Sequence, residues 1–207
     1  MAGSGEPRQA VATYPRRRLD NLSDGIFGVA MTLLVLEVHF PDGFNPRTDQ
    51  DLTAALVDLS PKIGTYVLSF LILAIRWREL VAARTSEPEV GKAHVNWMLV
   101  NLLLVTFVPF TTLLIGRYAS LAPAVWIYAA NLVGMALSTW LAGRAAPSTA
   151  AGRAEETAGL LVFLGSAAVT VALSFQHTPW APMGFSLNAL APPVERWVRA
   201  RMGGGEA

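Results

Sequence analysis

The chain has 207 residues, of which 53% are hydrophobic and only 15% charged, and its mean hydropathy is +0.41. A soluble domain usually carries about 25% charged residues, so this composition favours an integral membrane protein. There is no cysteine, which excludes disulfides, thiolate catalysis and cysteine-based metal sites, and the net charge of +1 says little about partners.

The two ends of the chain are polar and frame one apolar domain. Residues 1–15 are small and polar and are predicted to form a disordered tail, residues 16–202 a transmembrane domain, and residues 203–207 a second tail. Three arginines, Arg16 to Arg18, precede the first apolar run, as they would in a signal peptide. That run continues to Val38 without a small-residue cleavage site, so we expect a retained first helix.

Six apolar segments follow one another along this domain. A bilayer core needs roughly 17–25 residues of helix, and the candidates are residues 21–40, 62–83, 95–115, 121–142, 157–175 and 180–198. The sixth is the weakest, because Pro182, Pro192 and Pro193 interrupt it. The runs are long, rich in Leu and Ala, and lack sustained alternation, which argues against strands. The predicted fold is therefore an all-α integral membrane protein with six transmembrane helices.

Loop charges give the predicted orientation, because Lys and Arg concentrate on the cytoplasmic side of a membrane protein. With both termini and the second and fourth loops on one side, that side carries 13 of the 16 basic residues. The other side holds only Arg47, Lys62 and Arg117. We therefore expect a multi-pass protein of the cell membrane with cytoplasmic N- and C-termini. Acidic residues of the first loop are expected to solvate it and to cap a short helix over residues 51–59.

The first segment carries an ordered apolar stripe. At 100° per residue, six side chains fall within about 60° of Val29 on a helix: Leu22, Gly25, Val29, Thr32, Leu33 and Leu36. Ser23 and Asp24 point away from it. A carboxylate inside a membrane helix is costly unless it is paired, although the helix dipole favours Asp24 in the first turns. Taken alone, such a stripe is most commonly ordinary helix packing.

The same segment resembles the signature of the transmembrane protein 175 family, the lysosomal potassium channels and their bacterial homologues. The matching residues are Arg18, Ser23, Asp24, Gly25, Thr32, Leu36 and Glu37. Leu22 departs from the pattern, because the family usually has Phe there. Later segments fit more loosely, through Ser69 and Phe70, Trp77, the stretch from Asn101 to Phe110, and Tyr128 with Asn131.

The resemblance implies a homotetramer in which four first helices line a central pore, without the Thr-Val-Gly-Tyr-Gly filter of ordinary potassium channels. By position, Val29 would form the apolar constriction, Leu33 and Leu36 the next layers outward, and Thr32 a ring of hydroxyls. Arg18, Ser23 and Asp24 would form a structural polar hub, with Asp24 in helix packing. The implied function is a potassium-permeable cation channel, modestly selective over sodium.

No bound cofactor, structural metal ion, catalytic residue or nucleic-acid partner is expected beyond the permeating cations and the lipid bilayer. The alternatives are a secondary transporter, whose paired interrupted helices are not evident here, and a non-conducting membrane scaffold, which the residues do not distinguish. No His-Glu zinc motif or Gly-x-Ser-x-Gly motif suggests an enzyme. Asn96, Asn101 and Asn131 are expected to donate hydrogen bonds between helices, and the alternative is that a line of asparagines coordinates a substrate.

Overall fold

A computed structural model of the chain describes residues 13–41, 43–82, 88–145 and 150–175, and the single residues 184, 185, 187, 194 and 197. It contains five long helices, α1 (Arg16–Leu33), α2 (Asp49–Ala82), α3 (Lys92–Tyr118), α4 (Ala122–Arg144) and α5 (Ala150–Ser174). A 3₁₀ turn, η1 (Leu34–Glu37), continues α1, and two short strands, β1 (Thr13–Pro15) and β2 (Glu89–Gly91), pair antiparallel.

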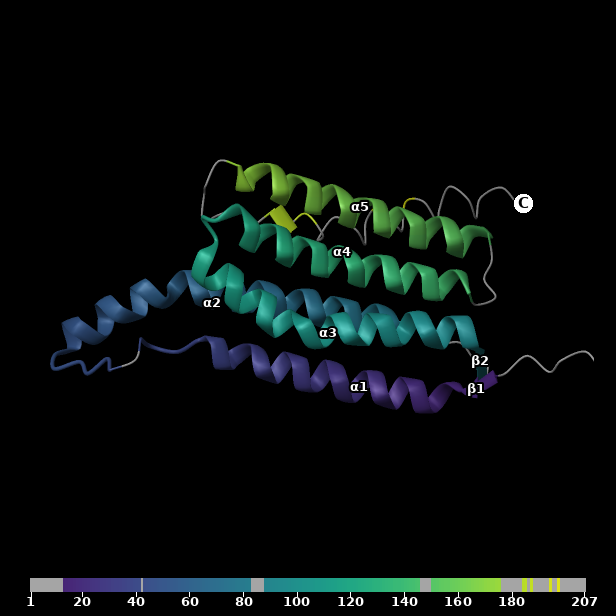
Figure 1. Cartoon of the computed structure of the whole chain (residues 1–207), viewed down its shortest axis with the longest axis horizontal. Helices are drawn as coiled ribbons and strands as arrows, with labels where there is room; N and C mark the ends of the chain where they lie inside the picture. Colours follow the sequence, from purple (N-terminus) through teal and green to yellow (C-terminus); the bar gives the residue numbers. More distant parts are fainter. Residues whose placement is uncertain are drawn as a thin grey trace, which may run out of the picture.

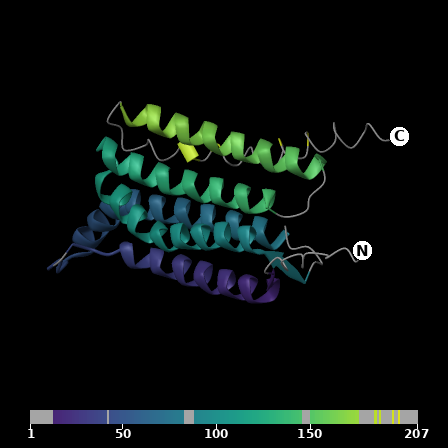
Figure 2. The same cartoon turned by 45° about the vertical axis from the view of Figure 1, so that its right-hand side comes forward.

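The helices lie side by side and alternate in direction, with α3 and α4 between α1 and α5 (Figures 1 and 2). Within the described residues, five helices are long and apolar enough to cross a membrane. This agrees with the predicted all-α membrane fold for the first five segments. The sixth predicted segment, residues 180–198, lies largely outside the described residues, as do most of both predicted tails. The last residues of the N-terminal tail differ from the prediction, because Thr13–Pro15 form β1.

The described basic residues follow this topology. The starts of α1, α3 and α5 and the ends of α2 and α4 gather at one end of the bundle (Figure 1). The described members of the larger basic set lie near those helix ends, including Arg16, Arg76, Lys92, Arg144 and Arg153. Arg117 lies in the last turn of α3, at the opposite end. The bundle therefore keeps apart the two groups of charges that predict its orientation.

The second helix is longer than its apolar run predicts. It begins at Asp49 with a capping box, in which the Asp51 N–H donates to Thr48 Oγ1 at 3.1 Å and the Thr48 N–H donates to Asp51 Oδ2 at 3.0 Å. Pro61 lies inside the helix and cannot donate to the carbonyl four residues earlier. That carbonyl, of Val57, accepts a hydrogen bond from Ser60 Oγ at 2.6 Å instead.

This substitution of donors lets the expected short helix and the second segment form one continuous α2. Its 34 residues correspond to about 51 Å at 1.5 Å per residue, well beyond a bilayer core of about 30 Å. The first part of α2 accordingly extends past the ends of the other helices (Figure 1).

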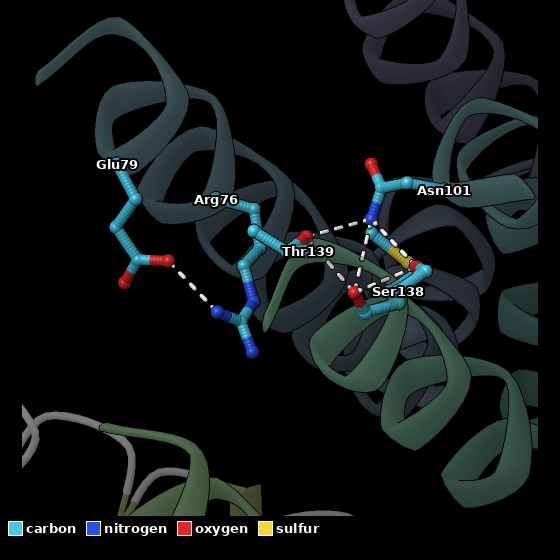
Figure 3. A network of polar contacts seen from close by, with 6 residues as sticks. Arg76, Glu79, Asn101, Ser138 and Thr139 are labelled. Atoms are coloured by element: carbon cyan, nitrogen blue, oxygen red, sulfur yellow. Dashed lines mark hydrogen bonds and ion pairs between the residues drawn. The ribbon is translucent and has the colours of Figure 1, made fainter. Parts of the chain in front are cut away.

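The core lies between α3 and α4, where Val105, Val108, Tyr128, Leu132 and Met135 are at most 1% exposed. Hydrogen bonds between helices specify this packing, because a polar group in hydrocarbon needs a partner. The Asn101 amide nitrogen donates to the carbonyl of Met135 at 3.0 Å and to Thr139 Oγ1 at 2.9 Å, and lies 3.2 Å from Ser138 Oγ (Figure 3).

Three further hydrogen bonds of polar side chains join the helices. Thr112 Oγ1 of α3 donates to Ser69 Oγ of α2 at 2.8 Å, and this oxygen lies 3.0 Å from the hydroxyl of Tyr128 in α4. Asn131 Nδ2 donates to the Leu104 carbonyl at 3.3 Å. The predicted interhelical roles of Asn101 and Asn131 are therefore confirmed, whereas Asn96 is exposed on α3.

Candidate functional site

The first helix has a buried face that fastens it to the bundle. Leu19, Ser23, Phe27, Ala30 and, in η1, Leu34 are buried. They recur every three or four residues and so form one stripe along the helix. Phe27, Ala30 and Leu34 belong to the main apolar core, which includes residues of α2 and α3. Helix α1 is therefore held from one side only.

The opposite side of α1 is exposed and mostly apolar. We call this the free face, and it consists of Leu22, Gly25, Val29, Thr32, Leu33 and Leu36, all of which are exposed. Val29 is 59% exposed and Leu36 65% exposed, although both are aliphatic. The six residues are those of the predicted stripe. In a membrane such a face meets either lipid or another protein surface.

One small residue and one hydroxyl distinguish the free face. A Cβ placed on Gly25 would meet no atom within 4 Å, so this glycine leaves the face flat in one subunit. Thr32 Oγ1 donates to the Val29 carbonyl at 2.8 Å. Because its proton is committed to the backbone, the exposed Thr32 oxygen can only accept or coordinate, which is the role that suits a cation ligand.

The polar residues at the start of α1 have separate contacts. Ser23 Oγ donates to the Leu19 carbonyl at 2.8 Å, within the helix. Asp24 Oδ1 accepts a hydrogen bond of 2.9 Å from the indole nitrogen of Trp77 in α2. Arg18, six residues before Asp24, is exposed. Asp24 thus joins α1 to α2, while a hub that also includes Arg18 stays a prediction.

The contact between Trp77 and Asp24 was not predicted from the sequence. The signal that could have predicted it is the depth at which the two residues lie in the membrane. The first two segments run in opposite directions, so the start of one and the end of the other lie at the same level of the membrane. An indole donor there could have been matched to the carboxylate of Asp24.

A second unpredicted contact lies beyond the other end of the free face. His39 Nδ1 lies 3.1 Å from the Leu36 carbonyl, and its Nε2 lies 3.3 Å from Arg117 Nη2 of α3. Because a guanidinium only donates, Nε2 is the acceptor and Nδ1 the donor in this arrangement. The end of η1 is therefore tied to the last turn of α3 through one imidazole ring.

Within the described ranges, no three His, Cys, Asp or Glu side chains gather in a way that could hold a metal ion. The described part of the molecule is a multi-pass bundle of membrane-length helices whose first helix offers a long unpaired face. This defines the class, a multi-pass membrane protein, and places its candidate functional surface on α1.

Comparison with known proteins finds similarity to one family over part of the chain. Residues 18–109 match the family described as endosomal/lysosomal potassium channel TMEM175. A potassium channel of Chamaesiphon minutus is 34% identical over 101 residues, 49% of this chain and 49% of that protein. A potassium channel of Streptomyces collinus is 32% identical over 126 residues, 58% of this chain and 59% of that protein. The chain thus matches about half the length of these curated relatives.

The fold agrees over a longer stretch. The crystal structure of a lysosomal potassium-selective channel TMEM175 homologue from Chamaesiphon minutus superposes with a TM-score of 0.64 at 26% sequence identity, covering 88% of this chain and 97% of that one. The chain is therefore similar to the TMEM175 family in sequence over residues 18–109 and to the TMEM175 homologue of Chamaesiphon minutus in fold over most of its length. The family match includes all of α1 beyond its first two residues, and with it the whole free face.

Proposed function

We propose that this chain forms a potassium-permeable cation channel, modestly selective over sodium, in which four copies of α1 surround a pore. The observation that carries the proposal is the free face. A helix fastened on one side, with an exposed aliphatic stripe on the other, needs copies of itself to enclose a path across the membrane. The similarity to potassium channels of Chamaesiphon minutus and Streptomyces collinus supports the same assignment.

The proposed constriction is the ring of Val29 side chains, followed outward by Leu33 and Leu36. Apolar rings gate by dewetting, and an ion that passes a narrow apolar neck must shed part of its water. Potassium holds its water less tightly than sodium, so a neck of this kind favours potassium modestly. Thr32 lies within one turn of Val29, and its outward oxygen would repay part of the lost hydration.

The channel would lie in the cell membrane with both termini in the cytoplasm. The separation of basic residues between the two ends of the bundle supports this orientation. A membrane-impermeant maleimide applied to intact cells tests it. We expect reaction at Arg47→Cys and none at Lys92→Cys until the cells are permeabilised, and the reverse pattern would overturn the orientation.

Ion flux from liposomes containing the purified protein tests the proposal. Wild type and Val29→Asn are compared under a potassium gradient and then a sodium gradient. We expect potassium-driven flux in wild type, and faster, less selective flux in Val29→Asn, because the amide wets the neck. Val169→Asn is the matched control, since Val169 is also exposed but lies on α5.

The outcomes separate the alternatives. A change confined to Val29→Asn supports a pore on the free face, and equal changes in both variants place the pore elsewhere. Well-folded protein that passes neither cation would favour the non-conducting scaffold, and flux that saturates and requires a second coupled ion would favour a transporter.

A further inference from the structure

A small sheet ties the start of α1 to the connection between α2 and α3. Strand β1 leads directly into α1, and β2 leads directly into α3 (Figure 1). The antiparallel register pairs Thr13 with Gly91, Tyr14 with Val90 and Pro15 with Glu89. The pairing continues by one bond, since the Arg16 N–H donates to the Pro88 carbonyl at 3.0 Å. We call residues 13–16 and 88–91 the clasp.

The Arg16–Pro88 bond sets the alternation along the clasp. Antiparallel partners alternate between hydrogen-bonded and non-hydrogen-bonded pairs, so Tyr14–Val90 is the next bonded pair. Pro15 then falls at a non-bonded position, where its missing N–H removes nothing from the ladder. Thr13 Oγ1 donates to the Glu89 carboxylate at 2.5 Å and adds a side-chain bond across the two strands.

The clasp is also anchored by apolar packing. Val90 is 6% exposed and forms a cluster with Leu19 of α1, Met98 of α3 and Ala142 of α4. Leu19 lies one turn into α1, directly after the backbone pairing. The first turn of α1 is therefore held both by strand pairing and by the cluster around Val90.

We propose that the clasp is a positioning element for the proposed pore, which sets the depth and rotation of α1. Helix α1 packs on one face only, and apolar packing tolerates sliding and rotation. A shift of one residue along a helix axis moves a side chain by about 1.5 Å and turns it by about 100°, which would carry Val29 off the free face. Strand pairing resists this shift, because a slip of one residue breaks the register. The proposal rests on the proposed function.

A designed disulfide tests whether the clasp forms in the membrane, in a chain that has no cysteine of its own. In non-bonded antiparallel pairs the Cα atoms lie about 4.5 Å apart, a separation that suits a disulfide. We expect the double variant Thr13→Cys/Gly91→Cys to oxidise readily. The control is Thr13→Cys/Glu89→Cys, a diagonal pair two residues out of register, which should oxidise much more slowly. Equal or absent oxidation in both would overturn the clasp.

Three single variants test positioning. Tyr14→Pro removes a ladder N–H. Thr13→Pro removes the side-chain bond to Glu89 but no ladder N–H, and Tyr14→Ala removes the side chain while keeping the N–H. We expect Tyr14→Pro alone to lower the potassium-to-sodium permeability ratio several-fold. If the three variants share the wild-type ratio, or shift it alike, the clasp does not position the pore.

A distance measurement distinguishes failure of the clasp from failure of the proposed function. Spin labels at Arg17→Cys and Lys92→Cys, both exposed positions, report the distance between the starts of α1 and α3 in one subunit. We expect a narrow distribution in Thr13→Pro and Tyr14→Ala and a broad one in Tyr14→Pro. Protein that passes no cation but behaves in this way would contradict the channel and retain the clasp. Narrow distributions in all three would overturn the clasp whatever the flux.

Discussion

Single residues of α1 divide between packing and exposure by their angle around the helix axis. The spacing of Leu22, Val29 and Leu36 predicts one stripe, and all three are exposed. The prediction succeeds because helical periodicity is local. The partners of Asp24 and His39 were not predicted, since Trp77 and Arg117 lie 53 and 78 residues further along the chain. Such pairs depend on which helices become neighbours.

Val29 is the residue whose size we expect to set the width of the neck. Isoleucine adds one methylene, so Val29→Ile should narrow the neck and raise the potassium-to-sodium ratio. We expect a gain of roughly two- to threefold, because a tenfold change would need about 1.4 kcal/mol. Reversal potentials under mixed ionic conditions measure it. Val169→Ile adds the same group on α5 and should leave the ratio unchanged. An unchanged ratio in Val29→Ile would contradict a constriction at this position.

Asp24 lies off the free face, so its side chain does not line the proposed pore. Asp24→Ala should therefore weaken folding or assembly more than selectivity, by about 1 kcal/mol for the lost hydrogen bond from Trp77. Asp24→Asn retains an acceptor and should be milder. Thermal unfolding in detergent and the permeability ratio are measured on the same samples. A large change in selectivity at wild-type stability would assign Asp24 to the ion path instead.

At the scale of elements, apolar length located five helices but not the start of the second. The prediction began that helix where the apolar run begins, near residue 62. The structure begins it at Asp49, because a capping box initiates the helix and Ser60 replaces the donor that Pro61 lacks. The two strands of the clasp were also missed, since three residues carry no detectable alternation and their pairing joins distant segments.

The contact between α3 and α4 depends on Asn101 more than on any other polar residue of α3. Asn101→Ala removes hydrogen bonds to Met135 and Thr139 and should cost about 1–2 kcal/mol, since interhelical hydrogen bonds in membranes average about 0.6 and reach about 1.7 kcal/mol. Thermal unfolding in detergent measures the loss. Asn96→Ala is the matched control, because Asn96 lies on the same helix and is exposed. Equal effects of the two variants would show that the buried contact adds nothing.

At the scale of the whole molecule, the sequence predicts the order and alternation of the helices, whereas the assembly of copies stays a prediction. The alternation of the helices and the clustering of the basic residues are both properties of a single chain. Assembly depends on surfaces that one chain leaves exposed, and many are apolar because lipid covers them. Leu161 on α5 is 62% exposed, nearly the same as Leu36 on the free face. Exposure alone therefore does not identify the face that meets another copy.

The proposed tetramer makes these two leucines behave differently. If four free faces meet at the pore, single cysteines at Leu36 lie near one another across the axis, whereas cysteines at Leu161 face lipid. We expect oxidation to give covalent dimers for Leu36→Cys and monomers for Leu161→Cys, in a protein without other cysteines. The detergent-solubilised particle should have four times the 22.2 kDa subunit mass. A monomeric particle, or dimers through Leu161→Cys alone, would remove the free face from the pore and leave it facing lipid.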